Sequence, residues 1–333
     1  MQLAELMTTV EEGRFRCDAC QWRCVLGAGD VGRCQMRVGT PEGIELLNHS
    51  MISNATIGPV EDHRLWHFFP DTLALAVGSF GYAFPADQQR GPNAQMPEDE
   101  AKRRRLPAER AAQVALDKLC RGVIWSYSDP AVSHEYVRDV LHLARSGSRY
   151  TAMVTTGYMT IEGFDAYAPY THGMSLDLRG FSDTSYARLA GISEWHGVLD
   201  VAEHAFTKWG CHIEVTTRIH HGVNDNPDEL RAMVSWIGQN LGMQTPWHVL
   251  PGDAGAETAA AVLRARRIGH ENGLVFIYGN EPNQSTQCPK CQATLITRMN
   301  GVAKLVGLEE LHCTTCNERI KLRTSIFKQR TDR

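Results

Sequence analysis

Apolar and polar positions alternate regularly along the middle of the chain, from about residue 71 to residue 280. Short apolar runs, typical of buried strands, are separated by longer stretches in which apolar residues recur at helical spacing. The predicted strands cover 73–78, 122–128, 150–157, 173–180, 212–219, 245–250 and 273–280. The predicted helices cover 107–119, 136–144, 185–189, 198–209, 226–241 and 256–268. This alternation predicts an α/β fold with a parallel sheet and right-handed crossovers.

The number of these units decides between two architectures for the sheet. Six or seven units favour a full or partial (β/α) barrel, and no glycine-rich dinucleotide fingerprint follows the first strand, as it would in many open doubly wound sheets. The flanking segments differ in character from the alternating region. We therefore expect three parts. Residues 1–70 form an N-terminal four-cysteine module with a connecting segment, residues 71–280 form the barrel, and residues 281–333 form a C-terminal cysteine module with a basic tail.

Polar residues follow the predicted strands at their carboxyl ends. Because chemistry in a parallel barrel takes place at this end of the strands, we expect these side chains to line the barrel mouth. They are Ser79, Ser128, Asp129, Thr155, Thr156, Asp177, Arg179, Arg218, His220, His221, His248 and Asn280.

Composition narrows the classes of function. The net charge of -4 and the pI near 6.4 give no global reason to expect a nucleic-acid or anionic-membrane partner. No apolar stretch approaches the length of a membrane span, and the first residues have no secretory signal pattern. We therefore expect a cytoplasmic protein that does not bind membranes.

Eight of the ten cysteines fall into two tight groups, and grouped thiols in a cytoplasmic protein indicate metal binding. The C-terminal group consists of two C-x-x-C turns with a strand-like stretch between them, which is the spacing of a zinc ribbon. Four thiolates close the coordination sphere, so we expect a structural zinc. The predicted ligands are Cys288, Cys291, Cys313 and Cys316.

The N-terminal group has the less common spacing C-x2-C-x3-C-x9-C, formed by Cys17, Cys20, Cys24 and Cys34. Structural zinc is the favoured interpretation, and an iron-sulfur cluster on the same four thiolates is the alternative. Spacing alone leaves both open. The two remaining cysteines stand alone, and we expect buried, inert thiols at Cys120 and Cys211.

Motifs spread over nearly the whole chain resemble one family. They are CDACQWRCVLGAGDVGRCQMR, GPVEDHRLWHFFP, LALAVGSFGYAF, WSYSDPAVSHEYVRDVLHLA, VTTGYMT, SLDLRGFSDTSYARLAG, IEVTTRIHHGVNDNPDELR, PWHV, FIYGNEPN and the closing CPKC and CTTC turns. In this order they resemble the radical SAM protein of the AmmeMemoRadiSam system, a relative of the pyruvate formate-lyase activating enzymes. The resemblance implies a radical-SAM-like partial (β/α) barrel.

The family resemblance also implies a [4Fe-4S] cluster on a C-x3-C-x2-C motif after the first strand, with one iron free to bind S-adenosylmethionine. Here the corresponding positions are Ser79, Ala83 and Ala86, and no cysteine lies between Cys34 and Cys120. The motif Ser128-Asp129-Pro130 also departs from the Asn-Glu-Pro of the family, and LPGDAG replaces its Arg-Phe pair. Linked departures at one face predict natural loss of the barrel cluster and of radical chemistry.

Three functions remain as hypotheses. The favoured one is a degenerate, radical-SAM-like protein with two metal modules that acts as a binding or scaffolding component of a complex. The alternative is an enzyme of the radical SAM or SAM-binding class, and between the two lies a barrel that binds S-adenosylmethionine without cleaving it, through Asp129, Thr155 or Asp177. A second hypothesis is an enzyme with a new metal or acid/base site at the barrel mouth, formed from Asp177, Glu214, His248 and one of His220 and His221, which strand alternation places on opposite faces.

The third hypothesis is nucleic-acid binding through the ribbon and the basic segments 102–105 and 321–333, which the acidic overall charge disfavours. Protein partners follow from the resemblance alone, which implies Memo-like or AMMECR-like proteins. The polar segment 83–105 is predicted to be an exposed loop and is a candidate contact surface, whereas the aromatic run at 66–69 is more typical of a core.

Overall fold

The computed structural model describes residues 2–281, 283–299 and 302–327. Its central feature is an eight-stranded sheet in the order β15-β14-β13-β12-β11-β10-β8-β7. All neighbouring pairs are parallel except β7 with β8. The strands are β7 (Asn54–Pro59), β8 (Leu73–Gly78), β10 (Gly122–Trp125), β11 (Tyr150–Thr155), β12 (Gly173–Asp177), β13 (His212–Ile219), β14 (Trp247–Pro251) and β15 (Ile277–Tyr278).

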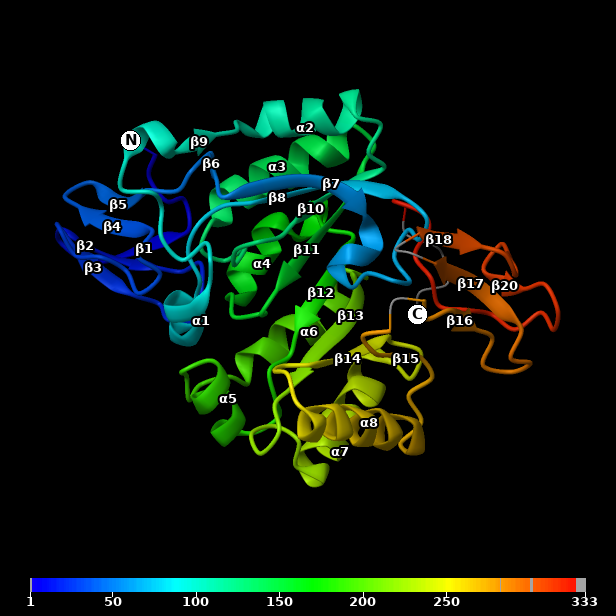
Figure 1. Ribbon diagram of the computed structural model, residues 1–333. Coiled ribbons are helices and arrows are strands. Elements are labelled where there is room, and N and C mark those ends of the chain that lie inside the picture. Colours follow the sequence, from blue (N-terminus) through cyan, green and yellow to red (C-terminus); the bar gives the residue numbers. More distant parts are fainter. Residues whose placement is uncertain (1, 282, 300–301, 328–333) are drawn as a thin grey trace.

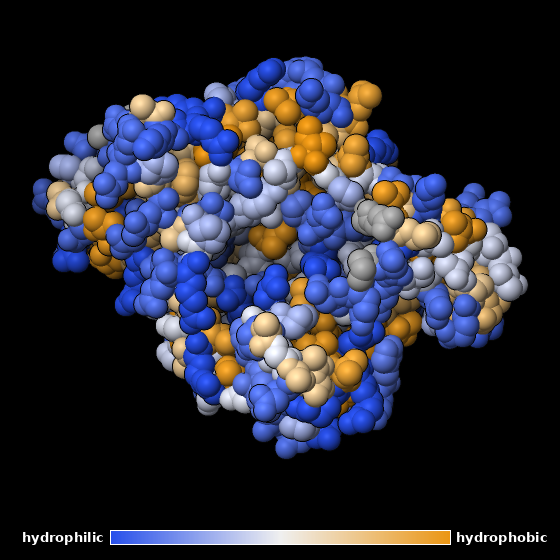
Figure 2. All heavy atoms as spheres, viewed as in Figure 1, coloured by the Kyte–Doolittle hydropathy of each residue, from blue (hydrophilic) through white to orange (hydrophobic). Residues whose placement is uncertain are grey.

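The parallel strands follow one another in the sheet in the same order as in the sequence. An open doubly wound sheet reverses its order at a switch point, whereas a barrel does not. In the described part of the chain β7 and β15 are the two edges, so the barrel stays open on one side. Figure 2 shows a hollow in the middle of this face. The predicted partial (β/α) barrel is therefore confirmed.

Helices cover the outside of the sheet (Figure 1). They pack through apolar stripes, as in α3, where Val137, Val140, Leu141 and Ala144 are buried. The predicted start of the helix after β13 is also confirmed, because the Asn226 side chain accepts the amides of the first turn. The helices are α2 (Ala108–Asp117), α3 (His134–Ser146), α4 (Ile161–Tyr167), α5 (Asp183–Leu189), α6 (Gly197–Thr207), α7 (Pro227–Trp236) and α8 (Ala256–Glu271).

Short irregular turns complete the barrel. They are η1 (Val60–His63), η3 (Ala168–Tyr170) and η4 (Ile237–Leu241). The barrel sheet begins with β7 and not at residue 71, because β7 pairs along its whole length with β8.

The N-terminal module is a set of short antiparallel strands beside the carboxyl ends of the barrel strands (Figure 1). One sheet contains β1 (Met7–Glu11), β2 (Arg14–Cys17) and β3 (Val25–Gly27), and a second contains β4 (Arg37–Thr40) and β5 (Gly43–Leu46). A further pair, β6 (Met51–Ile52) with β9 (Arg104–Arg105), ties the connecting segment to the chain before α2. The module has a small core of its own that includes Phe15, Leu26 and Ile44.

The segment 83–105 is only in part the exposed loop predicted from its polar composition, because residues 83, 84 and 86 are buried whereas 98–102, 104 and 105 are exposed. It contains the helix α1 (Pro85–Arg90), the turn η2 (Glu100–Lys102) and β9. Phe84 anchors it, because this ring is fully buried and its centroid lies 5.2 Å from that of Tyr158. Burial of this ring helps to hold the beginning of an otherwise polar segment on the barrel.

The C-terminal module lies at the opposite end of the barrel from the N-terminal module (Figure 1). It contains β16 (Thr286–Gln287), β17 (Thr294–Met299) and β18 (Val302–Leu305) in one antiparallel sheet, with the pair β19 (Leu308–Glu309) and β20 (His312–Cys313) beyond it. In the described residues, no helix has the length and apolar character needed to cross a membrane.

Candidate metal centres and barrel mouth

The C-terminal cysteines lie on two turns with the same backbone path. In the first, the amide of Gln292 donates to the Cys288 carbonyl (3.0 Å), and in the second the amide of Asn317 donates to the Cys313 carbonyl (2.8 Å). Gln292 and Asn317 both have left-handed backbone conformations, with φ of 63° and 60°. The spacing C-x-x-C thus produces the same turn twice, and each turn carries two thiols.

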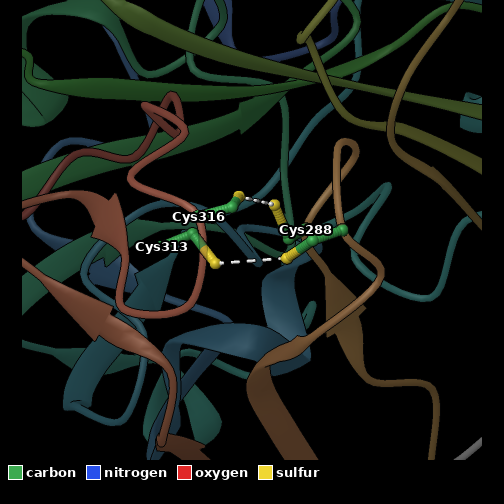
Figure 3. Close-up of side chains that lie close together, drawn as sticks. Cys288, Cys313 and Cys316 are labelled. Atoms are coloured by element: carbon green, nitrogen blue, oxygen red, sulfur yellow. Dashed lines mark hydrogen bonds between the residues drawn. The ribbon is translucent and has the colours of Figure 1, made fainter.

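The four sulfur atoms of this group all lie within 4.8 Å of one another. The Sγ atoms of Cys288 and Cys316 are 3.5 Å apart, and those of Cys291 and Cys313 are 3.6 Å apart (Figure 3). Thiolates in tetrahedral coordination at about 2.3 Å from zinc would be about 3.8 Å apart. The group therefore fits one tetrahedral ion, with no position left for a reacting molecule.

The N-terminal cysteines also come together, at the contact between their module and the barrel. The amide of Cys17, at the end of β2, donates to the Cys24 carbonyl (2.8 Å), and Cys20 forms an isolated β-bridge with Met159, beyond β11. The cavity between the four thiols is lined by residues of both parts, namely Cys17, Ala19, Cys20, Trp22, Cys24, Leu26, Gly32, Cys34, Arg37, Ala131 and Val132. The sequence predicted this set from spacing, and the structure places all four around one cavity.

The loop after β8 contains the three positions at which the family resemblance implies cluster ligands. Ser79 and Ala83 are fully buried and Ala86 is 8% exposed. The Ser79 hydroxyl donates to the Asn48 carbonyl (3.2 Å), and the Trp22 indole N–H donates to the Ala83 carbonyl (2.7 Å). These residues are part of the packing between the module and the barrel.

This loop does not fit an iron-sulfur cluster. Its amide at Ser79 donates to the Ser128 hydroxyl (3.0 Å), and a Cβ atom at Gly81 would come within 2.6 Å of Met36 and 2.8 Å of Val132. Thiolates are needed to hold such a cluster, and alanine offers no ligand atom. We therefore assign no chemistry to a cluster at this position.

Asp129 is buried at the barrel mouth and connects two loops. One carboxylate oxygen accepts the Ala131 amide (3.2 Å) and the other accepts the Thr156 hydroxyl (3.0 Å). Burial raises its pKa to about 6 despite these hydrogen bonds. Thr155 is engaged as well, because its hydroxyl accepts the amide of Gly157 (2.9 Å). Both residues already have partners within the loops that they join.

Asp177 and Arg179 form an ion pair, and Arg179 also pairs with Asp87 of α1. The Arg179 guanidinium donates to Asp177 (3.0 Å) and, through both terminal nitrogens, to Asp87 (3.1 and 2.9 Å). Its central carbon lies 5.6 Å from the ring centroid of Phe84. Two carboxylates thus hold one largely buried guanidinium, which fixes α1 to the end of β12.

The structure brings together only two of the residues predicted for a new site at the mouth, Glu214 and His248, which lie 2.9 Å apart. His220 and His221 follow β13 and face Asp253 (3.2 Å) and Asp225 (2.9 Å) respectively. His248 lies deep in the barrel, fully buried. Glu214 and His248 therefore form a buried pair below the mouth, whereas His220 and His221, at the end of β13, have other acidic partners. The exposed members of the mouth set include Arg218, His221 and Asn280.

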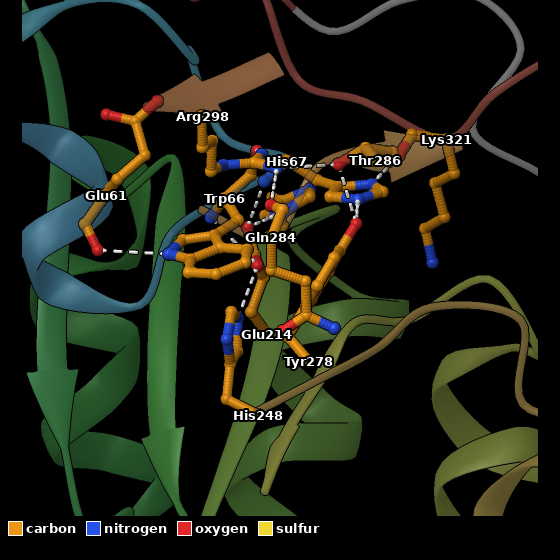
Figure 4. A network of polar contacts seen from close by, with 11 residues as sticks. Glu61, Trp66, His67, Glu214, His248, Tyr278, Gln284, Thr286, Arg298 and Lys321 are labelled. Carbon is orange, nitrogen blue, oxygen red and sulfur yellow. Dashed lines mark hydrogen bonds and ion pairs between the residues drawn. The ribbon is translucent and has the colours of Figure 1, made fainter. Parts of the chain in front are cut away.

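Glu214 and His248 belong to a buried network at the end of the barrel opposite the mouth, which we call the barrel floor (Figure 4). Glu214 accepts four hydrogen bonds, from the amides of Trp66 (3.0 Å) and His67 (2.7 Å) and from the rings of His212 (3.0 Å) and His248 (2.9 Å). Burial disfavours its charge, but the bonds from His212 and His248 outweigh burial and hold its pKa well below the usual range. The carboxylate thus fixes the aromatic run at 66–69 inside the barrel.

The same network reaches the C-terminal module. Arg298 donates to the Trp66 carbonyl (2.8 Å) and the Thr286 hydroxyl (2.8 Å), and its guanidinium lies 4.4 Å from the Trp66 ring centroid. The Tyr278 hydroxyl bridges Thr286 and the imidazole of His67, at 2.7 Å from each. The sequence analysis named Glu214 and His248 but placed them at the mouth, and it missed their partners from the segment 66–67 and from the C-terminal module. A signal was present, because His212 and Glu214 are both polar and point to the same face of β13.

One basic segment considered for nucleic-acid binding has local acidic partners. Lys102 lies 3.7 Å from Asp99 and Arg103 lies 3.3 Å from Glu100. In the tail, residues 328–333 lie outside the described residues. The lone Cys120 and Cys211 are both buried, as expected.

Comparisons with known proteins place these observations in context. No protein-family model matches the chain. It is 28% identical over 337 residues to the uncharacterized protein MJ0808 of Methanocaldococcus jannaschii, a match that covers 97% of this chain and 99% of that protein. This relative is itself uncharacterized, so the similarity assigns no function to the chain.

Solved structures similar to the chain include radical SAM enzymes. A radical SAM methyltransferase from Sphaerobacter thermophilus has a TM-score of 0.49 and 14% identity, over 68% of this chain and 70% of that chain. A domain of pyruvate-formate lyase-activating enzyme from Bacteroides vulgatus has a TM-score of 0.41 and 15% identity, over 48% of this chain and 99% of that chain.

Proposed function

We propose that this chain is a degenerate radical-SAM-type barrel that has lost the barrel cluster and acts as a binding or scaffolding component of a protein complex. The observation that carries the proposal is the loop after β8. At the three positions where the family resemblance implies thiolates, this chain has Ser79, Ala83 and Ala86, all buried in protein packing. Radical cleavage of S-adenosylmethionine needs an iron with an open position, and no ligand for such an iron is present in this loop.

The neighbouring polar groups support the same proposal. Asp129 accepts hydrogen bonds from Ala131 and Thr156, and Asp177 is paired with Arg179. Side chains that would have to hold S-adenosylmethionine without a cluster are thus engaged with the protein. A ligand would have to replace these hydrogen bonds, including those of a half-buried ion pair.

Retention of both cysteine modules argues against simple decay of the fold. The C-terminal thiols have the geometry of a metal site, and the N-terminal thiols surround one cavity. These modules stabilise two ends of a barrel whose own chemistry is gone, which is the pattern expected for a protein kept for what it binds. The resemblance points to Memo-like or AMMECR-like proteins as the partners.

The test is a search for radical chemistry. The chain is purified and reconstituted anaerobically with iron and sulfide, then supplied with dithionite and S-adenosylmethionine, and 5'-deoxyadenosine is measured. The expected result is no product above a protein-free control. A triple variant with Ser79→Cys, Ala83→Cys and Ala86→Cys restores C-x3-C-x2-C and serves as the matched comparison. Deoxyadenosine formation by the parent chain would overturn the proposal.

The positive arm of the test is binding. The tagged chain is mixed with purified Memo-like and AMMECR-like proteins, and complex formation is measured by size-exclusion chromatography with light scattering. The expected result is a complex with at least one of them, and a lack of complex with either would remove these partners from the proposal.

A further inference from the structure

The two four-cysteine groups differ in how their sulfur atoms are spaced. Among the described residues, the C-terminal group is the one set of metal-ligating side chains in which three or more ligand atoms lie within 4.8 Å of one another. The N-terminal thiols do not meet this distance, although they line one common cavity. One tetrahedral zinc would draw its four thiolates to about 3.8 Å from one another. In the described residues no three of the N-terminal sulfur atoms are that close together, so their spacing is wider than one tetrahedral zinc requires.

An iron-sulfur cube is larger than a single ion, because its iron and sulfide atoms lie between the thiolates. The same four ligands then stand farther apart around a central volume. The N-terminal thiols have this arrangement, with Ala131 and Val132 of the barrel closing the cavity on one side. Cys17, Cys20 and Cys34 are buried, and Cys24 is half-buried.

A buried charge also faces the cavity. Arg37 lines it and forms a two-point ion pair with Glu135 of α3, at 2.6 and 3.2 Å, with both side chains at most 2% exposed. Its Nε has no hydrogen-bond partner. A guanidinium in this position offsets part of the negative charge of four thiolates and connects the module to the barrel.

We propose that Cys17, Cys20, Cys24 and Cys34 hold a [4Fe-4S] cluster, at the contact of the N-terminal module with the barrel mouth. All four irons then have a thiolate ligand, so the cluster has no open position for S-adenosylmethionine. It is a structural or one-electron centre, with the half-buried Cys24 on its more accessible side. This inference does not depend on whether the barrel has lost radical chemistry.

The experiment measures metals and sulfide in chain purified under strictly anaerobic conditions. We expect about four irons and about four sulfides per chain, together with about one zinc at the ribbon. The cluster is identified by its absorbance near 400 nm, by Mössbauer spectra of iron-57 material and by the EPR signal after reduction with dithionite. Two zincs and no iron, before and after reconstitution, would overturn the proposal.

Variants assign the iron to its ligands. Cys24→Ser, at the most exposed of the four positions, is expected to lose most of the iron and keep the zinc, whereas Cys288→Ser is expected to do the reverse. Cys211→Ser, at a lone buried thiol, is the matched control and is expected to keep both. Circular dichroism of each variant checks that the barrel has folded. Full iron content in a folded Cys24→Ser and Cys34→Ser double variant would place the iron elsewhere and refute the assignment.

The metal analysis and the deoxyadenosine assay test the two proposals separately. Iron that depends on the N-terminal thiols, without deoxyadenosine formation, supports both proposals. Two zincs without iron refute the cluster and leave the scaffold proposal intact. Deoxyadenosine formation refutes the scaffold proposal, while the iron content of Cys24→Ser still decides the cluster.

Discussion

Replacement of Glu214 by glutamine tests whether the barrel floor depends on a buried carboxylate. One oxygen of Glu214 accepts the His67 amide and the His212 ring, and the other accepts the Trp66 amide and the His248 ring. Glutamine keeps the shape but presents an NH2 group to one of these pairs. A histidine can change tautomer to accept from that group, whereas a backbone amide cannot.

The expected cost follows from this difference. One buried backbone N–H loses its acceptor, which costs about 1–3 kcal/mol. The other three hydrogen bonds to Glu214 lose their charged acceptor. In the parent protein each hydrogen bond to a charged group contributes about 1.5–3 kcal/mol to stability. Because glutamine retains part of these bonds, we expect Glu214→Gln to lower the free energy of unfolding by about 3–5 kcal/mol, as for other broken buried pairs.

Urea denaturation, followed by far-ultraviolet circular dichroism and tryptophan fluorescence, measures the effect. Trp66 belongs to the floor network, so part of the fluorescence change comes from this region. The matched control is Glu162→Gln, which removes a half-exposed pair with Arg23 and should cost less than about 1 kcal/mol. A midpoint for Glu214→Gln equal to that of the parent, or no lower than that of the control, would refute the reasoning.

Three further predictions concern pH, zinc and the module contact. Burial lowers the pKa of His67 and of His172 to about 3, below an unfolded value of about 6.5. The stability that these neutral, buried imidazoles contribute is therefore complete above pH 6.5 and is lost as the pH falls. The loss reaches up to about 1.4 kcal/mol per pH unit for each residue. Urea midpoints that stay level between pH 7 and pH 5 would contradict this prediction. Cys316→Ser is expected to remove about one zinc per chain and to make the C-terminal module sensitive to limited proteolysis. A variant that keeps its zinc would exclude Cys316 as a ligand. Arg37→Met leaves Glu135 buried without its partner and is expected to cost about 3–5 kcal/mol, with partial recovery in the double variant with Glu135→Gln. No recovery in the double variant would show that packing, and not charge, dominates at this position.

The barrel could be predicted from the sequence because its signals are local. An apolar run with strand length, or an apolar stripe with helical spacing, expresses the burial of one face whatever lies opposite. The cap at Asn226 and the two C-x-x-C turns are also local, since the residues that close them lie within a few positions. These are the features that the structure confirms.

Distance along the chain explains what was missed. α1 depends on Phe84, whose partners Tyr158 and Tyr186 come from other units of the barrel. Glu214 and the Trp66 amide are 148 positions apart, so no local pattern connects them. The sequence analysis assigned Glu214 to the mouth, whereas its contacts with the inserted aromatic run place it at the opposite end of the barrel.

For the loop after β8 and the two cysteine groups, the sequence also determines some features and the tertiary structure determines others. By itself, the sequence determines that Ser79, Ala83 and Ala86 have no thiolate to offer, because ligand chemistry is a property of each side chain. It also determines which eight cysteines form groups. The tertiary structure alone decides that the loop is filled by packing against the N-terminal module, and that one group of thiols is tight while the other surrounds a cavity. Sulfur spacing depends on how the module and the barrel meet, and that contact is not encoded in any short stretch of the chain.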